Sequence, residues 1–174
     1  MRVRTWTLLA AIGLLVAGCA EARERGAGGG PEAAEQPEQP TQESTLTIKA
    51  FDFGFDLSGV TSIPPGQVTF TMTNDGKQPH HAQFLPLADG VTFEDFIEAV
   101  ETYPAPAELD FSPEIRELYV PPAQGVLNWV SRGEEISPKD DLEAGSYVLI
   151  CAIKDPESGR RHYEMGMLEP FEVG

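Results

Sequence analysis

The chain has 174 residues and is strongly acidic, with 28 Asp and Glu against 12 Lys and Arg and a formal net charge of −16. This charge argues against nucleic acid and anionic lipid surfaces as partners, because both are themselves negatively charged. It is compatible with a basic protein partner, although solubility is the simpler explanation for the excess of acids.

Residues 1–18 have the pattern of an export signal peptide. Arg2 and Arg4 supply positive charge, and an apolar run from Leu8 to Ala17 follows. About ten apolar residues are too few to span a bilayer, which needs about 20, so a cleaved signal fits better than a retained transmembrane helix. Cleavage after Gly18 would remove two arginines and no acid, and would change the formal charge from −16 to −18.

Cys19 ends a short motif at the boundary of this signal. The run from Leu15 to Cys19 resembles the bacterial lipobox, in which the Cys is lipidated on sulfur and becomes the new N-terminus. Two or more lipid chains would anchor the protein firmly to the extracytoplasmic side of a bacterial membrane. The sequence therefore predicts a lipoprotein of the cell envelope, with a plain secretory signal as the alternative.

Residues 19–44 separate this signal from the folded part of the chain. They are rich in Gly, Glu, Pro, Gln and Ala and include no aromatic residue. Such a segment cannot bury enough apolar surface to offset its ordering entropy, so we interpret it as a disordered tether. Residues 45–174 are enough for one domain with a hydrophobic core.

Three β-strands are predicted in the first half of this domain. Residues 45–51 alternate polar and apolar side chains, which is the pattern of a half-buried strand. Residues 67–73 repeat the pattern, and residues 80–87 follow a turn that contains Asn, Asp and Gly. These three residue types tolerate the positive φ that tight turns need.

The periodicity becomes helical within residues 92–122. Apolar side chains at positions 93, 96, 97 and 100 share one helical face, and Thr92 with Asp95 has the pattern of a helix cap. A second, short helix is predicted over residues 113–119. We interpret residues 92–122 as one insertion between strands, which either covers an open end of the sheets or binds a partner.

Strand patterns return after the insertion, at residues 125–130, 134–142, 146–151 and 164–173. Around seven or eight strands with Gly and Pro turns predict an all-β fold, a Greek-key β-sandwich with a helical insertion.

Two stretches of the domain, residues 74–84 and 145–167, contain four side chains with metal-binding donor atoms: His80, Cys151, His162 and Met167. Two imidazoles and a thiolate in a plane, with a distant axial thioether, form the ligand set of a blue-copper electron-transfer centre. If Cys19 carries lipid, Cys151 is the one remaining thiol and has no partner in its chain for a disulfide.

The order and spacing of these residues resemble the cupredoxin family, the relatives of plastocyanin and azurin. The family's Asn-x-Gly-x-x-Pro-His turn matches residues 74–80, and its Gly-x-Tyr-x-x-x-Cys strand matches residues 145–151. Its closing His-x₄-Met matches residues 162–167. The resemblance covers most of the domain except the insertion. It implies one type 1 copper site with four ligands: His80, Cys151, His162 and Met167.

The ligand loop departs from the family's pattern. Family members place only a few residues between the Cys and the second His, whereas ten residues separate Cys151 from His162. Residues 154–161 look like an inserted polar hairpin, with Arg160 and Arg161 next to His162. Lengthening a loop costs roughly 0.6 kcal/mol per doubling, but a metal site needs its ligands held to within about half an ångström.

Two of the four ligand positions have a neighbouring competitor. His80 is preferred to His81 because it follows Pro79 as in the family, and adjacent strand residues point to opposite faces. Met165 competes with Met167, since residues two apart on a strand face the same side.

The resemblance implies an electron carrier and not an enzyme: a membrane-anchored copper protein that passes single electrons between redox partners of the envelope, with an exposed imidazole edge as the exit. Copper storage or delivery would use the same ligands. The alternative is a metal-free cupredoxin-like binding module whose recognition surface is residues 92–122. A hydrolase is disfavoured because the sequence supplies neither a nucleophile turn nor an oxyanion site. A zinc site is disfavoured because zinc would favour more thiols or carboxylates at close spacing.

Overall fold

The computed structural model describes residues 43–174. The predicted export signal, Cys19 and nearly all of the predicted tether lie outside the described residues. Within residues 43–174, no helix is both long enough and apolar enough to cross a membrane.

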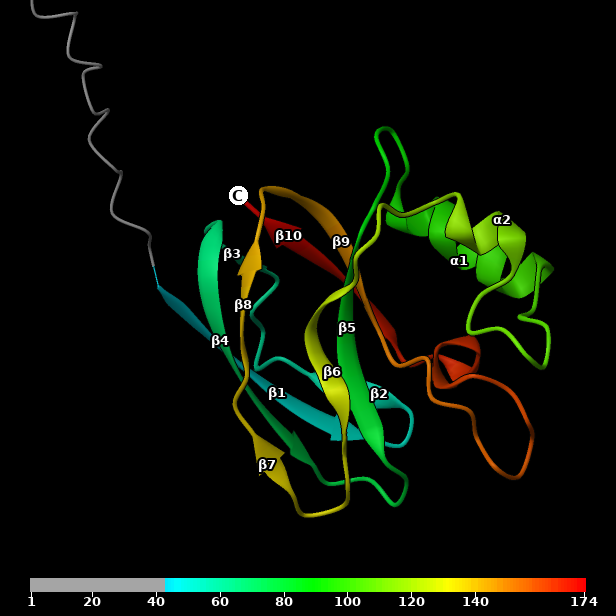
Figure 1. Cartoon of the computed structure of the whole chain (residues 1–174), viewed down its shortest axis with the longest axis horizontal. Coiled ribbons are helices and arrows are strands. Elements are labelled where there is room, and N and C mark those ends of the chain that lie inside the picture. The colour runs from blue at the N-terminus through cyan, green and yellow to red at the C-terminus, as the bar shows by residue number, and fades with distance from the viewer. Residues whose placement is uncertain (1–42) are drawn as a thin grey trace, which may run out of the picture. The chain divides into compact units, whose positions relative to one another are not determined.

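Two five-stranded β-sheets make up most of this domain (Figure 1). The first sheet contains β1 (Ser44–Phe51), β2 (Gly54–Asp56), β4 (Gly66–Asn74), β7 (Glu135–Ile136) and β8 (Lys139–Leu142). The second contains, from edge to edge, β3 (Ser62–Ile63), β10 (Leu168–Val173), β9 (Gly145–Ile150), β5 (His80–Pro86) and β6 (Gln124–Val130). The predicted all-β sandwich is confirmed.

The main hydrophobic core lies between the two sheets, because each strand buries alternate side chains. Val68, Phe70 and Met72 of β4 are buried in the core while the residues between them are partly exposed. Across the core, Phe70 contacts Phe84 of β5, with ring centroids 5.3 Å apart. The period-two pattern of the sequence therefore defines the inner faces of both sheets.

The helical insertion covers the outer face of the second sheet and forms a second core there. Helix α1 (Phe93–Thr102) and helix α2 (Pro113–Arg116) lie on the side of β5 and β9 that faces away from the first sheet (Figure 1). Phe96 and Ile115 of the two helices are buried in one cluster with Val148 and Ile150 of β9. The insertion thus covers a sheet face, and the expectation that it covers an open end of the sheets was wrong. The four residues Val148–Cys151 are all buried for the same reason, since β9 has a core on each side.

The predicted cap of α1 is present. Thr92 Oγ1 accepts a hydrogen bond from Asp95 N at 3.2 Å, and Asp95 Oδ2 accepts one from Thr92 N at 2.8 Å. This reciprocal pair satisfies two of the backbone N–H groups that a helix start leaves unpaired. Helix α2 is shorter than predicted, because Tyr119 pairs with Leu87 in an isolated β-bridge instead of continuing the helix.

Two predicted strands differ from the structure. The predicted strand 134–142 is divided into β7 and β8 at Ser137–Pro138, where proline has no N–H to donate to a ladder. The predicted strand 164–173 begins only at Leu168, because His162–Met165 form a short 3₁₀ helix, η1. Gly166 ends η1 with a left-handed φ of 103°. The premise that Met165 and Met167 lie on the same side of a strand was therefore wrong.

We expect Phe96→Ala to destabilise the whole domain by about 3–5 kcal/mol, because it removes a fully buried ring from the second core. Urea denaturation followed by circular dichroism measures this free energy. Tyr103→Ala is the matched control, since Tyr103 lies in the same insertion and is 45% exposed. This variant should change the free energy of unfolding by less than about 0.5 kcal/mol. Equal stability of the Phe96 variant and the wild type would mean that the insertion is not part of the cooperative fold.

Candidate metal centre

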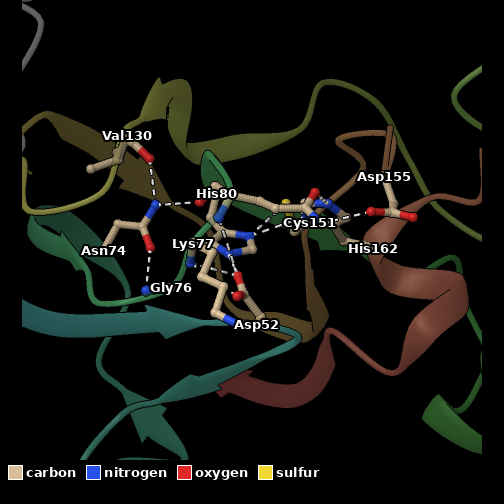
Figure 2. A network of polar contacts seen from close by, with 10 residues as sticks. Asp52, Asn74, Gly76, Lys77, His80, Val130, Cys151, Asp155 and His162 are labelled. Atoms are coloured by element: carbon tan, nitrogen blue, oxygen red, sulfur yellow. Dashed lines mark hydrogen bonds and ion pairs between the residues drawn. The ribbon is translucent and has the colours of Figure 1, made fainter. Parts of the chain in front are cut away.

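The turn between β4 and β5 positions His80. Asn74, the last residue of β4, is fully buried and donates through Nδ2 to the carbonyl oxygens of Gln78 at 2.7 Å and Val130 at 2.8 Å. Its Oδ1 accepts from Gly76 N at 2.8 Å (Figure 2). One amide side chain therefore satisfies three backbone groups and fixes the turn that precedes His80.

Glycine is required at position 76 because the turn has no room for a side chain there. A β-carbon at Gly76 would lie 2.5 Å from Asp52 Oδ1 and 2.8 Å from His80 Nε2. The sequence pattern had suggested a positive φ for the turn residues, but Gly76 is not among the glycines with positive φ. Its role is to let the backbone approach two polar side chains closely.

Three donor atoms from three different elements converge in the interior (Figure 2). His80 begins β5, Cys151 directly follows β9, and His162 begins η1. Cys151 Sγ lies 3.9 Å from His80 Nδ1 and 3.3 Å from His162 Nδ1, and the two Nδ1 atoms are 3.1 Å apart. All three side chains are fully buried.

These separations fit a transition-metal ion. An ion at the centre of the three donors, with bonds of about 2.0 Å to nitrogen and 2.3 Å to sulfur, requires donor atoms about 3.5–3.8 Å apart. The observed distances of 3.1, 3.3 and 3.9 Å lie within about half an ångström of that requirement. Imidazole nitrogen with a single thiolate sulfur is a donor set that suits copper.

Met167 is a buried sulfur-bearing residue whose backbone is bonded to two residues of this group. Its side chain is fully buried, its N–H donates to His162 O at 3.0 Å, and its C=O accepts from Cys151 N at 3.2 Å. Met165, the competing residue, is partly exposed in η1, and its sulfur accepts a hydrogen bond from Ser158 Oγ at 3.7 Å. The backbone therefore holds Met167 against two of the three donors.

The long ligand loop is fastened to the helical insertion. Tyr163 Oη donates to Asp110 O at 2.8 Å, and Glu164 Oε1 accepts from Ala105 N at 2.7 Å. Arg161 donates to Leu109 O at 2.8 Å and to Ala152 O at 3.2 Å. These bonds lie on both sides of His162 in the sequence, so the insertion restrains the end of a loop whose length alone would leave it poorly defined.

The arginines next to His162 are engaged elsewhere. The Arg161 guanidinium forms an ion pair with Asp110 at 3.2 Å, and the Arg160 guanidinium donates to Glu164 O. Each positive charge is therefore bound to an acceptor outside the three-donor group, which lessens its conflict with a metal cation.

The outer nitrogens of both imidazoles are covered. His80 Nε2 lies 3.0 Å from Asp52 Oδ1, His162 Nε2 lies 3.0 Å from Gln78 Oε1, and the ring of Phe53 packs edge-on against His162. The expectation of an exposed imidazole edge was wrong, because these three side chains exclude solvent from it. Gln78 lies within the recognised turn, but Asp52 is 28 residues from His80 and nothing in its local sequence identifies it.

His81 points to the opposite face of β5 from His80. Its Nε2 accepts a hydrogen bond from Ala152 N at 2.7 Å. It therefore ties β5 to the residue after Cys151 without joining the donor group, as the alternation of strand side chains predicts.

Burial keeps the donor side chains neutral. It lowers the pKa of His80, and it lowers the pKa of His162 to about 4, with the neighbouring His80 adding to the effect. Burial also raises the pKa of the Cys151 thiol to about 11. Metal binding would thus find two unprotonated imidazoles and would have to displace the thiol proton.

No protein-family model and no curated protein sequence matches this chain. Among solved structures, it is similar to auracyanin from Roseiflexus castenholzii, with 21% identity and a TM-score of 0.46 over 75% of this chain and 96% of that one. Auracyanin A, a "blue" copper protein from Chloroflexus aurantiacus, is 17% identical, with a TM-score of 0.45 over 76% of this chain and 100% of that one. Rusticyanin from Thiobacillus ferrooxidans is 15% identical, with a TM-score of 0.45 over 75% of this chain and 77% of that one.

The chain is thus similar to solved copper proteins, and three of the four ligands that the resemblance implied, His80, Cys151 and His162, converge in its structure. A case for copper here depends on the donor atoms of His80, Cys151 and His162.

The metal-free protein should lose stability as the pH falls from 6.5 towards 4. Burial, with His162 and His80 nearby, lowers the pKa of His81 to about 4 from its ordinary value of 6.5, so the unfolded chain takes up protons that the folded one does not. The contribution of His81 to the free energy of unfolding is complete above pH 6.5. It decreases by about 3 kcal/mol between pH 6.5 and pH 4. Thermal unfolding of chelator-treated protein at pH 7 and 4.5 measures the loss.

His81→Gln is the matched variant for this measurement. Glutamine keeps an acceptor oxygen for Ala152 N but does not titrate. We expect the variant to lose less stability on acidification than the wild type. The same loss in both proteins would contradict a titrating role for His81.

Proposed function

We propose that this protein binds one copper ion through His80, Cys151 and His162 and carries single electrons between redox proteins of the cell envelope. The convergence of two imidazole nitrogens and one sulfur in a buried space is the observation that supports this function. A bound copper ion would supply one-electron redox chemistry.

The residues around the donors are suited to that task because they hold the ligand atoms in place. Cys151 is hydrogen-bonded through its backbone to Tyr163 and Met167, and His162 N donates to Ile153 O at 2.9 Å. Such cross-links between β9, η1 and the start of β10 keep the donor atoms in one geometry. A site that moves little when its charge changes needs little reorganisation for electron transfer.

Met167 is proposed as the axial ligand. It is buried and hydrogen-bonded through its backbone to both Cys151 and His162, whereas the thioether of Met165 is bound to Ser158. A weak thioether donor in the axial position, off the plane of the three stronger ligands, would tune the reduction potential of a copper site.

An electron carrier is favoured over the other candidate functions. For a metal-free binding module, the apolar face of the insertion would have to meet a partner, but its buried side chains, Phe96 and Ile115 among them, pack on the protein's own sheet. For copper storage or delivery, the ligands would have to be accessible to an exchanging partner, but His80, Cys151 and His162 are fully buried. The proposal of an electron carrier includes no catalytic residue.

We further propose a lipid anchor at Cys19 on the extracytoplasmic side of a bacterial membrane. Support comes from the Leu15–Cys19 motif at the end of the apolar run. The low-complexity residues that follow would separate the copper domain from the membrane and allow it to meet a redox partner.

Adding Cu(II) to the purified protein should give an intense visible absorption band from charge transfer between the Cys151 thiolate and the ion. Cys151→Ala should abolish the band, because it removes the thiolate from the three donors that converge in the described residues. Cys19→Ser should retain it. Absence of the band in the wild type, with the Cys151 thiol still free, would contradict copper binding at this site.

Met167→Leu should raise the reduction potential of the copper-loaded protein, because loss of the thioether destabilises the electron-poor Cu(II) state more than Cu(I). Voltammetry of the purified protein measures the potential. Met165→Leu is the matched control and should leave it unchanged. The reverse result would assign the axial position to Met165.

Cys19→Ser should abolish incorporation of labelled fatty acid and move the protein from the membrane fraction to the soluble fraction. The reason is that stable anchoring requires the lipid chains, since the apolar run of the signal is too short to span a bilayer. Cell fractionation with immunodetection checks the location. Continued labelling of the Ser variant would contradict lipidation at this residue.

A further inference from the structure

The hydrogen bond between Asp52 and His80 determines which nitrogen of His80 carries a proton (Figure 2). A carboxylate has only acceptor oxygens, so the Nε2–H group of His80 must be the donor of the hydrogen bond to Asp52 Oδ1. In a neutral imidazole the other nitrogen, Nδ1, then has a free lone pair. Nδ1 is the atom that faces Cys151 and His162.

Gln78 has the same effect on His162, but its orientation depends on Asp155. Gln78 Nε2 donates to Asp155 Oδ1 at 2.6 Å. Because that carboxylate can only accept, the amide oxygen of Gln78 faces His162 Nε2 at 3.0 Å. His162 must therefore donate from Nε2, and its Nδ1 lone pair also points to the donor group.

Both carboxylates are themselves fixed and ionised. Burial alone would raise the pKa of Asp52, but hydrogen bonds from Lys77 N, His80 and Gln78 N lower it below its ordinary value. Hydrogen bonds from Ser158 and Gln78 lower the pKa of Asp155 to about 2. Each can therefore act as a permanent acceptor at neutral pH.

We propose that Asp52 and Gln78 are positioning residues that hold both histidines in the Nε2–H tautomer, with Asp155 acting through Gln78. This inference rests on the proposed function in that the Nδ1 lone pairs are taken to face copper. Asp155 lies within residues 152–161, the ten-residue segment between Cys151 and His162. The longer ligand loop therefore supplies the carboxylate that orients Gln78.

Asp52 also places a negative charge next to one ligand. A carboxylate that accepts from a ligating histidine raises the basicity of that ligand. The effect stabilises Cu(II) more than Cu(I), because the oxidised ion has the higher charge. Loss of the charge at Asp52 should raise the reduction potential.

Nitrogen-15 NMR of the metal-free protein tests the tautomers directly. The ring nitrogens of His80 and His162 should show protonated Nε2 and unprotonated Nδ1 at pH 7. Gln78→Ala should release His162 from this tautomer and leave His80 unchanged. Protonated Nδ1 at either histidine of the wild type would overturn the proposal.

Copper titration provides the second readout. Asp52→Ala and Gln78→Ala should each weaken copper binding by about 10- to 100-fold. Asp75→Ala is the control, because Asp75 lies in the same turn and is exposed, and no hydrogen bond of its side chain is found among the described residues. It should bind copper like the wild type.

Asp52→Asn separates positioning from folding. Asparagine keeps an acceptor oxygen, so this variant should fold and should bind copper more tightly than Asp52→Ala. Because it lacks the negative charge, its reduction potential should be higher than that of the wild type. Wild-type affinity in both Asp52→Ala and Gln78→Ala would overturn the proposal while leaving copper binding intact. A wild type that binds no copper would overturn the proposed function instead, and the NMR result would still decide the tautomers.

Discussion

The approach of two imidazole nitrogens and one sulfur within 3.9 Å of one another is the constraint on which the rest of the structure depends. If both rings carry their protons on Nε2, two lone pairs face each other across 3.1 Å, and without a cation only the thiol proton of Cys151 can lie among the three atoms. Polar atoms in this state are costly to bury. The surrounding fold must therefore hold them there, and a metal ion would relieve their repulsion.

The helical insertion and the long ligand loop form one structural unit. By itself, each is an addition to a two-sheet β-sandwich, and the ten residues between Cys151 and His162 weaken the sequence case for a metal site. In the structure Tyr163 is buried in the second core, and its hydroxyl donates to the insertion at Asp110. Packing of the insertion thus restores the precision that loop length removes.

Local patterns in the sequence predicted strands β1, β4, β5, β6 and β9, the cap at Thr92 and Asp95 and the turn before His80, because each depends on neighbouring residues. The 3₁₀ helix at His162–Met165 was missed, since its boundary depends on backbone bonds to Cys151 and Ile153 across the loop. The cover over the imidazoles was missed for the same reason. Asp52 meets His80 across 28 positions and Gln78 meets Asp155 across 77, and no periodicity encodes such contacts.

Closure of the site also bears on the chemistry of its thiol. A thiol without a disulfide partner can be oxidised, and its susceptibility follows thiolate character and accessibility. Cys151 is fully buried, and burial raises the pKa of its thiol to about 11, so the metal-free chain offers almost no thiolate at neutral pH. The side chains that exclude solvent from His80 and His162 therefore also protect the sulfur until a metal displaces its proton. An exposed imidazole edge would ease electron exchange but weaken that protection.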